Sequence, residues 1–210
     1  MSDTAAIWRF TEEFIVERPE IVLARQHSSE LGIDAVTPAV GAQLAVITAA
    51  SAPNNIIEIG TGAGVSGLWM LSGAPKAMLT SIDIEAEYQQ DARRAFSDAG
   101  IGANRIRLIT GRALDVLPRM NERSYDIALV DADPGKVIEY VEHALRLVRA
   151  GGTVLVNHAL WRGRVADPTQ RDDITVGYRT LLKEISESSA VISALSPVGD
   201  GVLQLTKRHD

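Results

Sequence analysis

The stretch Glu58-Ile59-Gly60-Thr61-Gly62-Ala63-Gly64 is the strongest indication of fold in this 210-residue chain. It begins inside a short apolar run and places three glycines at alternate positions, directly where that run ends. Glycine permits a tight turn, and its missing Cβ lets the backbone approach a ligand closely. A glycine-rich turn between a buried strand and a helix is typical of α/β folds that bind nucleotides.

Downstream of this turn, short strand-like runs alternate with amphipathic helical stretches. Such alternation predicts a parallel sheet with right-handed crossovers, and nearly continuous apolar runs predict strands covered on both faces. One helical stripe from Val137 to Val148 is predicted to end at Arg149-Ala150-Gly151-Gly152, a basic last turn followed by glycines. The predicted strands are Ile56–Ile59, Met78–Ile84, Ile106–Ile109, Ile127–Val130 and Thr153–Val156.

The C-terminal part of the chain departs from this alternation. A helical stretch over about Asp172–Ser188 precedes two strand-like runs, Ala190–Leu195 and Val202–Thr206. The short Pro/Gly/Asp turn between these runs predicts a hairpin, so the final strand should run antiparallel.

The N-terminal part is predicted to be helical. Residues 1 to about 54 contain no strand-like run, and Pro19 and Pro38 suit helix starts, so we expect two or three helices there. The chain as a whole, residues 1–210, is then a single doubly wound α/β domain. Its core spans residues 55–210, preceded by the helical N-terminal extension.

Acidic residues around the glycine turn favour S-adenosylmethionine as the ligand. Asp83 closes the second predicted strand, 19 residues after Gly64, where a carboxylate can bond both hydroxyls of a ribose. Helix amides just beyond the turn, around Ser66, can bind a carboxylate. Glu58 would repel a pyrophosphate but would attract a ligand that carries an ammonium and a sulfonium.

The same residues leave two alternatives open. Gly62-Ala63-Gly64-Val65-Ser66-Gly67 matches the dinucleotide pattern G-x-G-x-x-G, which is a weak signal by itself. That register begins three residues after the strand, whereas a dinucleotide fingerprint opens directly at its end, so a nicotinamide-dependent oxidoreductase is the less favoured reading. In the other alternative, Glu58 caps a buried network and the glycines only turn the chain.

Composition narrows the possible partners. The net charge is −6 and the Lys and Arg residues are scattered, which argues against a nucleic-acid partner. No run approaches the roughly 18 apolar residues that span a bilayer, so no membrane partner is expected. The chain has no cysteine, which removes disulfides and thiolate metal sites, and no signal-peptide pattern, so we expect a cytoplasmic protein.

Several motifs in order resemble the cation-dependent O-methyltransferases, typified by catechol and caffeoyl-CoA O-methyltransferases. The resemblance runs from about Val36 through nearly the whole remaining chain and is strongest to an actinobacterial branch of that family. An ordered series of this kind is specific, unlike the glycine turn alone. The matching stretches are Val36–Leu44, Glu58–Trp69, Ser81–Ile84, Gly111–Ala113, Val130–Asp133, Gly151–Trp161 and Pro197–Gly201.

The resemblance implies a Rossmann-like, seven-stranded, mostly parallel sheet with an antiparallel last strand, and S-adenosyl-L-methionine as cofactor. It implies that Glu58, Gly60 and Ser66 lie near the methionine end of the cofactor. It also places Asp83 on the ribose and Ala113 beside the adenine. The cofactor-binding residues expected in this way are Val36, Glu58, Gly60, Thr61, Gly62, Gly64, Ser66, Asp83, Ile84, Ala113 and Asp131.

The resemblance also implies a role for the N-terminal extension. Val36 and Thr37 would form part of a lid over the methionine moiety, and residues 1–54 would serve as lid and dimerisation surface. Family members are commonly homodimers, and the acceptor would be a small hydroxylated molecule, most simply an aromatic one.

The metal and base positions depart from the family pattern. In the family, an Asp after the fourth strand and an Asp-Asn pair after the fifth strand hold a divalent cation. In this chain Asp131 matches the first Asp, but the pair is replaced by Asn157-His158. Three oxygen ligands suit Mg²⁺, whereas an imidazole better suits Mn²⁺, Fe²⁺ or Zn²⁺. The family's lysine base is replaced by Pro134, and Lys136 lies two positions later. The altered ligands leave three possibilities for the metal site: Mg²⁺, Mn²⁺ or no metal.

These departures suggest a different route to acceptor activation. We expect His158 to deprotonate the acceptor beside Asp131, since an imidazole titrates near neutral pH and such proton transfer contributes roughly 10²–10⁴-fold. In the alternative, His158 only bonds the backbone or Asp131. Trp161 is expected to wall the acceptor pocket. The altered positions also keep open a non-catalytic S-adenosylmethionine-binding protein.

Overall fold

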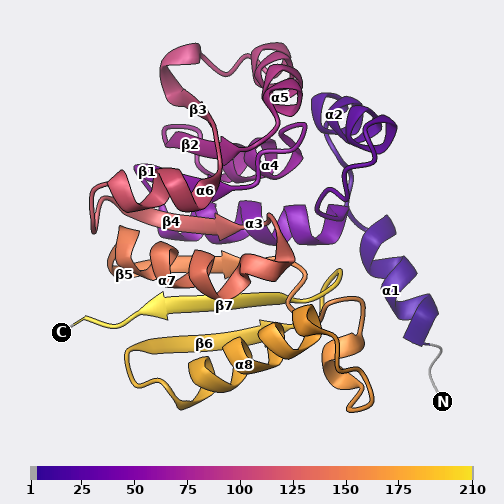
Figure 1. Ribbon diagram of the computed structural model, residues 1–210. Coiled ribbons are helices and arrows are strands. Elements are labelled where there is room, and N and C mark those ends of the chain that lie inside the picture. Colours follow the sequence, from indigo (N-terminus) through magenta and orange to yellow (C-terminus); the bar gives the residue numbers. More distant parts are fainter. Residues whose placement is uncertain (1–3, 210) are drawn as a thin grey trace.

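Seven strands form one sheet in the order β3-β2-β1-β4-β5-β7-β6 in the computed structural model, which describes residues 4–209 (Figure 1). Strands β1 to β5 pair in parallel, whereas β7 runs antiparallel to both β5 and β6, which confirms the predicted hairpin and fold class. The strands are β1 Asn55–Ile59, β2 Met78–Asp83, β3 Ile106–Thr110, β4 Tyr125–Val130, β5 Val148–Val156, β6 Val191–Ser196 and β7 Val202–Lys207.

Helices cover both faces of this sheet. One hydrophobic cluster packs α2 to α5 against it, and a second packs α7 and α8, which lie in front of β5 and β6 in Figure 1. The α-helices are α1 Thr4–Glu13, α2 Pro19–Glu30, α3 Pro38–Ser51, α4 Val65–Gly73, α5 Ala86–Asp98, α6 Ala113–Val116, α7 Val137–Leu147 and α8 Asp173–Glu187. Short 3₁₀ turns occupy Ala103–Arg105, Leu117–Arg119, Pro134–Lys136 and Arg164–Ala166.

Successive strands are added to the sheet on opposite sides of β1. Strands β2 and β3 build outward on one side, and β4 and β5 build outward on the other. In open α/β sheets the ligand crevice lies at such a reversal, outside the carboxyl ends of the strands. The helix α1 lies at this edge, beyond the arrowheads of β4 and β5 (Figure 1).

The N-terminal region forms three helices, as predicted. Pro19 and Pro38 each occupy the first turn of a helix, where a missing N–H costs no hydrogen bond. Thr37 caps α3, because its side-chain oxygen accepts a hydrogen bond from Val40 N at 3.3 Å. Among the residues that the structure describes, no helix is long and apolar enough to cross a membrane.

One predicted boundary is wrong. The helix α7 ends at Leu147, and Val148 already pairs with Tyr125 of β4, so β5 begins before the two glycines that were expected to stop a helix. The ladder shifts register after Tyr125, and Gly151 adopts φ +74° inside the strand. These glycines therefore accommodate an irregular strand pair rather than a helix end.

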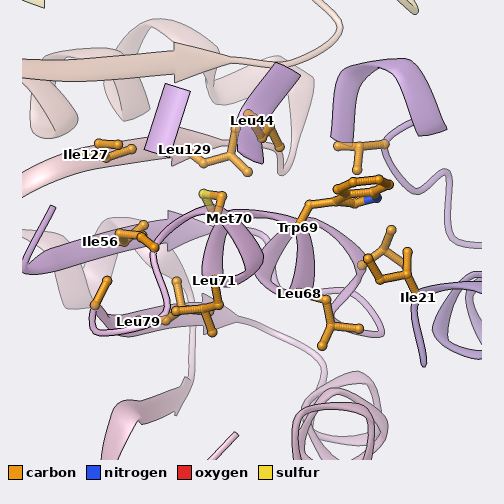
Figure 2. Close-up of a cluster of buried hydrophobic side chains, with 14 of the residues drawn as sticks. Ile21, Leu44, Ile56, Leu68, Trp69, Met70, Leu71, Leu79, Ile127 and Leu129 are labelled. Atoms are coloured by element: carbon orange, nitrogen blue, oxygen red, sulfur yellow. The ribbon is translucent and has the colours of Figure 1, made fainter. Parts of the chain in front are cut away.

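A close contact joins α3 and α4 on one face of the sheet. Figure 2 shows Trp69 in the core cluster that also contains Leu44, Met70 and Ile21. A Cβ atom added to Gly41 of α3 would lie 2.2 Å from Trp69 Nε1, so the indole occupies the space where any other residue would place its side chain.

We therefore expect Gly41→Ala to destabilise the protein by roughly 1–3 kcal/mol, because the added methyl group overpacks a filled core. Gly177→Ala in α8 is the matched control: nothing lies within 4 Å of its added Cβ. In a helix interior that substitution should stabilise by roughly 0.5–1 kcal/mol. Urea unfolding of both variants measures the difference, and equal midpoints would contradict the prediction.

Candidate active site

Backbone hydrogen bonds continue the sheet one residue beyond three strand ends. Gly60 N donates to Ile82 O at 2.8 Å, Asp131 N to Ile59 O at 2.8 Å, and Asn157 N to Val130 O at 3.0 Å. Because neighbouring parallel strands end in register, the residues that follow β1, β4 and β5 meet at one edge.

The first glycine of the turn permits this arrangement. A Cβ atom at Gly60 would lie 1.8 Å from the carbonyl oxygen of Asp131, and its φ of +100° is one that other residues rarely adopt. Gly64 instead faces α5, since its added Cβ would lie 3.2 Å from Ala92. Of the cofactor contacts expected from sequence, Gly64 is therefore placed away from the cavity, where it lets two helices approach.

Asp83 holds the glycine turn in shape. Its Oδ2 accepts hydrogen bonds from Thr61 N at 2.8 Å and Gly62 N at 2.9 Å, and its Oδ1 accepts one from Glu85 N at 3.0 Å. The carboxylate thus stands at the end of β2, directly beside the turn, as the spacing of the two motifs predicted.

A cavity of about 560 Å³ opens at this edge of the sheet. That volume lies within the range of small-molecule sites. It brings together eight residues that the sequence singled out for the site: Gly60, Gly62, Asp83, Ile84, Ala113, Asp131, His158 and Trp161. A smaller adjoining cavity of about 60 Å³ adds Val36, Thr61 and Ser66.

Glu58 lies beneath this edge rather than in it. Its side chain is fully buried, and both carboxylate oxygens accept hydrogen bonds at 2.5 Å, one from Ser66 Oγ and one from Ser81 Oγ. Ser81 lies opposite Glu58 in the register of β1 and β2. A direct contact of Glu58 with a ligand was expected from sequence; the structure buries it and connects it to the cavity through Ser66.

Burial also changes the protonation of Glu58. It raises the pKa of this carboxyl to about 8, although the hydrogen bonds from the two serines oppose the shift. A carboxyl placed in an apolar core gains stability by keeping its proton.

Asp131 and the Asn157-His158 pair meet on the other side of the cavity. Asn157 Nδ2 donates to Asp131 Oδ1 at 3.1 Å, and His158 Nε2 lies 3.7 Å from the same oxygen. Burial raises the pKa of Asp131 above its usual range, and the nearby His158 opposes that shift. The sequence thus grouped these three side chains correctly.

The donor set does not fit a Mg²⁺ site. Mg²⁺ requires hard oxygen ligands in octahedral geometry. Here the one carboxylate already accepts a hydrogen bond from the Asn157 amide. Asn157 itself stands where the family has its second carboxylate, and His158, at the position of the family asparagine, is held by Asp200 at 3.1 Å. Within residues 4–209, no three His, Cys, Asp or Glu side chains are placed to hold a metal ion.

A second cavity, of about 410 Å³, extends from His158 toward the N-terminal helices. Trp8 and Glu12 of α1 line it on one side, and Asn157, His158 and Asp200 on the other. Trp161, expected to wall the acceptor pocket, lines the larger cavity instead. Its ring stacks on Tyr178, with centroids 5.7 Å apart and planes inclined by 16°.

The sequence did not predict the roles of two residues in this region, Asp200 and Arg179. Asp200 was placed in the turn between the last two strands and in a stretch that matches the family, but no local pattern pairs it with His158, because 42 residues separate them. No role in the site was expected for Arg179. From α8, its guanidinium donates to four carbonyl oxygens of the loop after β5. These belong to Arg164, Val165, Asp167 and Gln170.

The raised pKa of Glu58 predicts how stability depends on pH. A carboxyl whose pKa is raised on folding stabilises the fold below its unfolded value near 4.5, and loses that contribution as pH rises through about 8. We expect Glu58→Gln, which stays neutral, to weaken this decline by an amount on the order of a few kcal/mol.

Urea unfolding of the cofactor-free protein between pH 5 and pH 8 measures this dependence. Glu87→Gln, an exposed change in α5, is the control and should keep the wild-type slope. A wild-type slope in Glu58→Gln would show that Glu58 is ionised in the folded protein.

Comparisons with known proteins agree with this geometry. Residues 12–209 match a family model described as O-methyltransferase. A Mycobacterium tuberculosis protein named "Probable O-methyltransferase" is 45% identical over 199 residues, 94% of this chain and 89% of that protein.

Solved structures show the same similarity. A Corynebacterium glutamicum protein superposes with a TM-score of 0.90 at 29% identity, over 99% of this chain and 98% of that one. The Streptomyces achromogenes O-methyltransferase involved in tomaymycin synthesis, solved with S-adenosylmethionine, gives 0.83 at 28% identity, over 96% and 95%. The chain therefore belongs to the O-methyltransferase family as an S-adenosylmethionine-dependent enzyme with a small-molecule substrate.

Proposed function

We propose that this enzyme methylates a hydroxyl group of a small aromatic acceptor bound in the second cavity, and that His158 takes the hydroxyl proton. The observation that carries the proposal is the position of His158, which lines both the larger and the second cavity. A base at that junction would stand between a methyl donor on one side and an acceptor on the other.

The proposed cofactor position follows from the chemistry of the cavity walls. The adenosine would occupy the larger cavity, with Asp83 at its ribose and Ile84 and Ala113 at its adenine. The methionine end would enter the smaller cavity, beside Val36 and Ser66. Glu58 would then hold the Ser66 hydroxyl in place beside the methionine end through their buried hydrogen bond.

The reaction is an in-line displacement at the sulfonium methyl group. The acceptor oxygen forms a bond to the methyl carbon, the carbon–sulfur bond breaks, and S-adenosylhomocysteine leaves with the electron pair. The hydroxyl proton passes to His158 Nε2. Holding donor and acceptor in line can supply roughly 7–11 kcal/mol of the barrier reduction, so the enclosing walls matter as much as the base.

The N-terminal helices would have two roles. Trp8 and Glu12 of α1 close one side of the second cavity, which suits a lid over the acceptor. The same helix exposes Ile7 and Phe10, and Phe14 directly after it is also exposed; a second copy of the chain would cover this apolar surface in a homodimer. The division into a 1–54 extension and a 55–210 core, and the cytoplasmic location, stay predictions.

Loss of the imidazole tests the base. We expect His158→Ala to lower kcat by roughly 10²–10⁴-fold, the usual contribution of a positioned base, while the Kd for S-adenosylmethionine changes little. EDTA should leave wild-type turnover unchanged, because within residues 4–209 no three His, Cys, Asp or Glu side chains are placed to hold a metal ion. His143→Ala on α7 is the control and should keep wild-type kcat. Full activity of His158→Ala would contradict the proposed role of His158 as the base.

Charge in the second cavity predicts which acceptors are used. Glu12, Asp34 and Asp200 supply three carboxylates to its wall. Arg162, the one Arg or Lys among the described residues of that wall, lies 3.8 Å from Asp34. We expect ethylcatechol and dopamine to show a lower KM than dihydrocaffeate or caffeoyl-CoA, by at least about fivefold, because like charges repel at short range.

Initial rates with labelled S-adenosylmethionine compare these four acceptors. Asp34→Asn removes one carboxylate and releases Arg162, so it should narrow the gap between neutral and anionic acceptors. A lower KM for dihydrocaffeate than for ethylcatechol in the wild-type enzyme would contradict the prediction.

A further inference from the structure

We propose that Asp200 is a positioning residue that holds His158 in the tautomer needed for proton removal, in place of the family's metal. This inference rests on the proposed role of His158 as base. It assigns a site function to a residue of the hairpin turn, remote in sequence from the strand ends that carry the rest of the site.

The pairing of β5 with β7 brings the two residues together. Beyond the last paired residues, Ala159 N donates to Gly201 O at 2.9 Å and Leu160 N donates to Asp200 O at 2.9 Å. The segment after His158 is thus fastened to the turn before β7. Asp200 Oδ2 then lies 3.1 Å from His158 Nδ1, with both side chains about one-fifth exposed.

This contact decides which imidazole nitrogen carries hydrogen. An ionised carboxylate can only accept a hydrogen bond, so Nδ1 must be the donor and the lone pair of neutral His158 is placed on Nε2. Nε2 lies 3.7 Å from Asp131 Oδ1, beyond a normal hydrogen bond. The lone pair is therefore left for a hydroxyl in the cavities that His158 lines.

The two carboxylates have different roles once the proton moves. After Nε2 takes the acceptor proton, the imidazolium lies between Asp200 on Nδ1 and Asp131 near Nε2. Both negative charges stabilise that positive charge. An aspartate that orients a histidine and stabilises its protonated form is the same arrangement that serves nucleophile activation in catalytic triads.

Asp200 also holds an unfavourable backbone in place. His158, Trp161 and Arg162 all have positive φ, at 55°, 45° and 55°. Non-glycine residues keep such angles only where the surroundings enforce them. Asp200 Oδ1 accepts a hydrogen bond from Arg162 N at 2.6 Å, so one carboxylate fixes both the imidazole and the turn that presents it.

The tautomer can be measured without an acceptor. Long-range ¹H–¹⁵N NMR of the histidine side chains at pH 8.5, where an ordinary imidazole is neutral, distinguishes Nδ1–H from Nε2–H. The His158 signal is assigned by its loss in His158→Ala. We expect Nδ1–H in the wild-type protein and a mixture of tautomers in Asp200→Asn and Asp200→Ala. An Nε2–H wild-type imidazole would overturn the inference.

Kinetics provide the second readout. We expect Asp200→Asn to lower kcat by at least about tenfold, and by up to the roughly 10⁴-fold seen when the aspartate of a protease triad is changed to Asn. The Kd for S-adenosylmethionine should stay near the wild-type value, which shows that the variant is folded. Asp200→Glu, which keeps the carboxylate, should recover part of the rate. Asp98→Asn, an exposed change at the end of α5, is the control.

The outcomes separate this inference from the proposed function. If His158→Ala is fully active, the base itself is wrong, and the inference falls with it. If His158→Ala is inactive while Asp200→Asn keeps wild-type kcat and tautomer, the base stands and only the role of Asp200 is overturned.

Discussion

The close approach of β1 and β4 at their carboxyl ends is the constraint on which this site depends. The carbonyl of Asp131 occupies the position that a Cβ atom at residue 60 would need, so only glycine lets the two strand ends lie side by side. The chain reverses its direction across the sheet at this pair. The glycine turn on one strand and Asp131 on the other therefore face one cavity.

Around that constraint, the two halves of the site are built in different ways. The half assigned to the cofactor is largely a backbone structure, in which Asp83 holds the amides of Thr61 and Gly62 and the buried Glu58 holds Ser66. The half assigned to the acceptor is built from side chains on strained backbone. Its imidazole takes the place of the asparagine in the family's metal-binding pair, and a carboxylate from the hairpin supports that imidazole.

The predictions of secondary structure were correct where the pattern of residues within one segment is enough to identify the element. The alternation of strands and helices, the hairpin, the prolines at the starts of α2 and α3, and the acidic end of β2 were all legible along the chain. The start of β5 was wrong because Gly151 and Gly152 suit a helix end as well as an irregular strand. Only pairing with Tyr125 decides between these readings.

The amino-acid sequence was enough to identify the fold class, the glycine turn, the acidic partner Asp83 and the altered pair Asn157-His158, because each is carried by patterns along the chain. That Glu58 is buried, with its pKa raised, was visible in the structure alone, since burial depends on what packs over a residue. The structure alone also placed Asp200 on His158. That contact arises from the antiparallel pairing of β5 with β7, which brings together residues 42 positions apart.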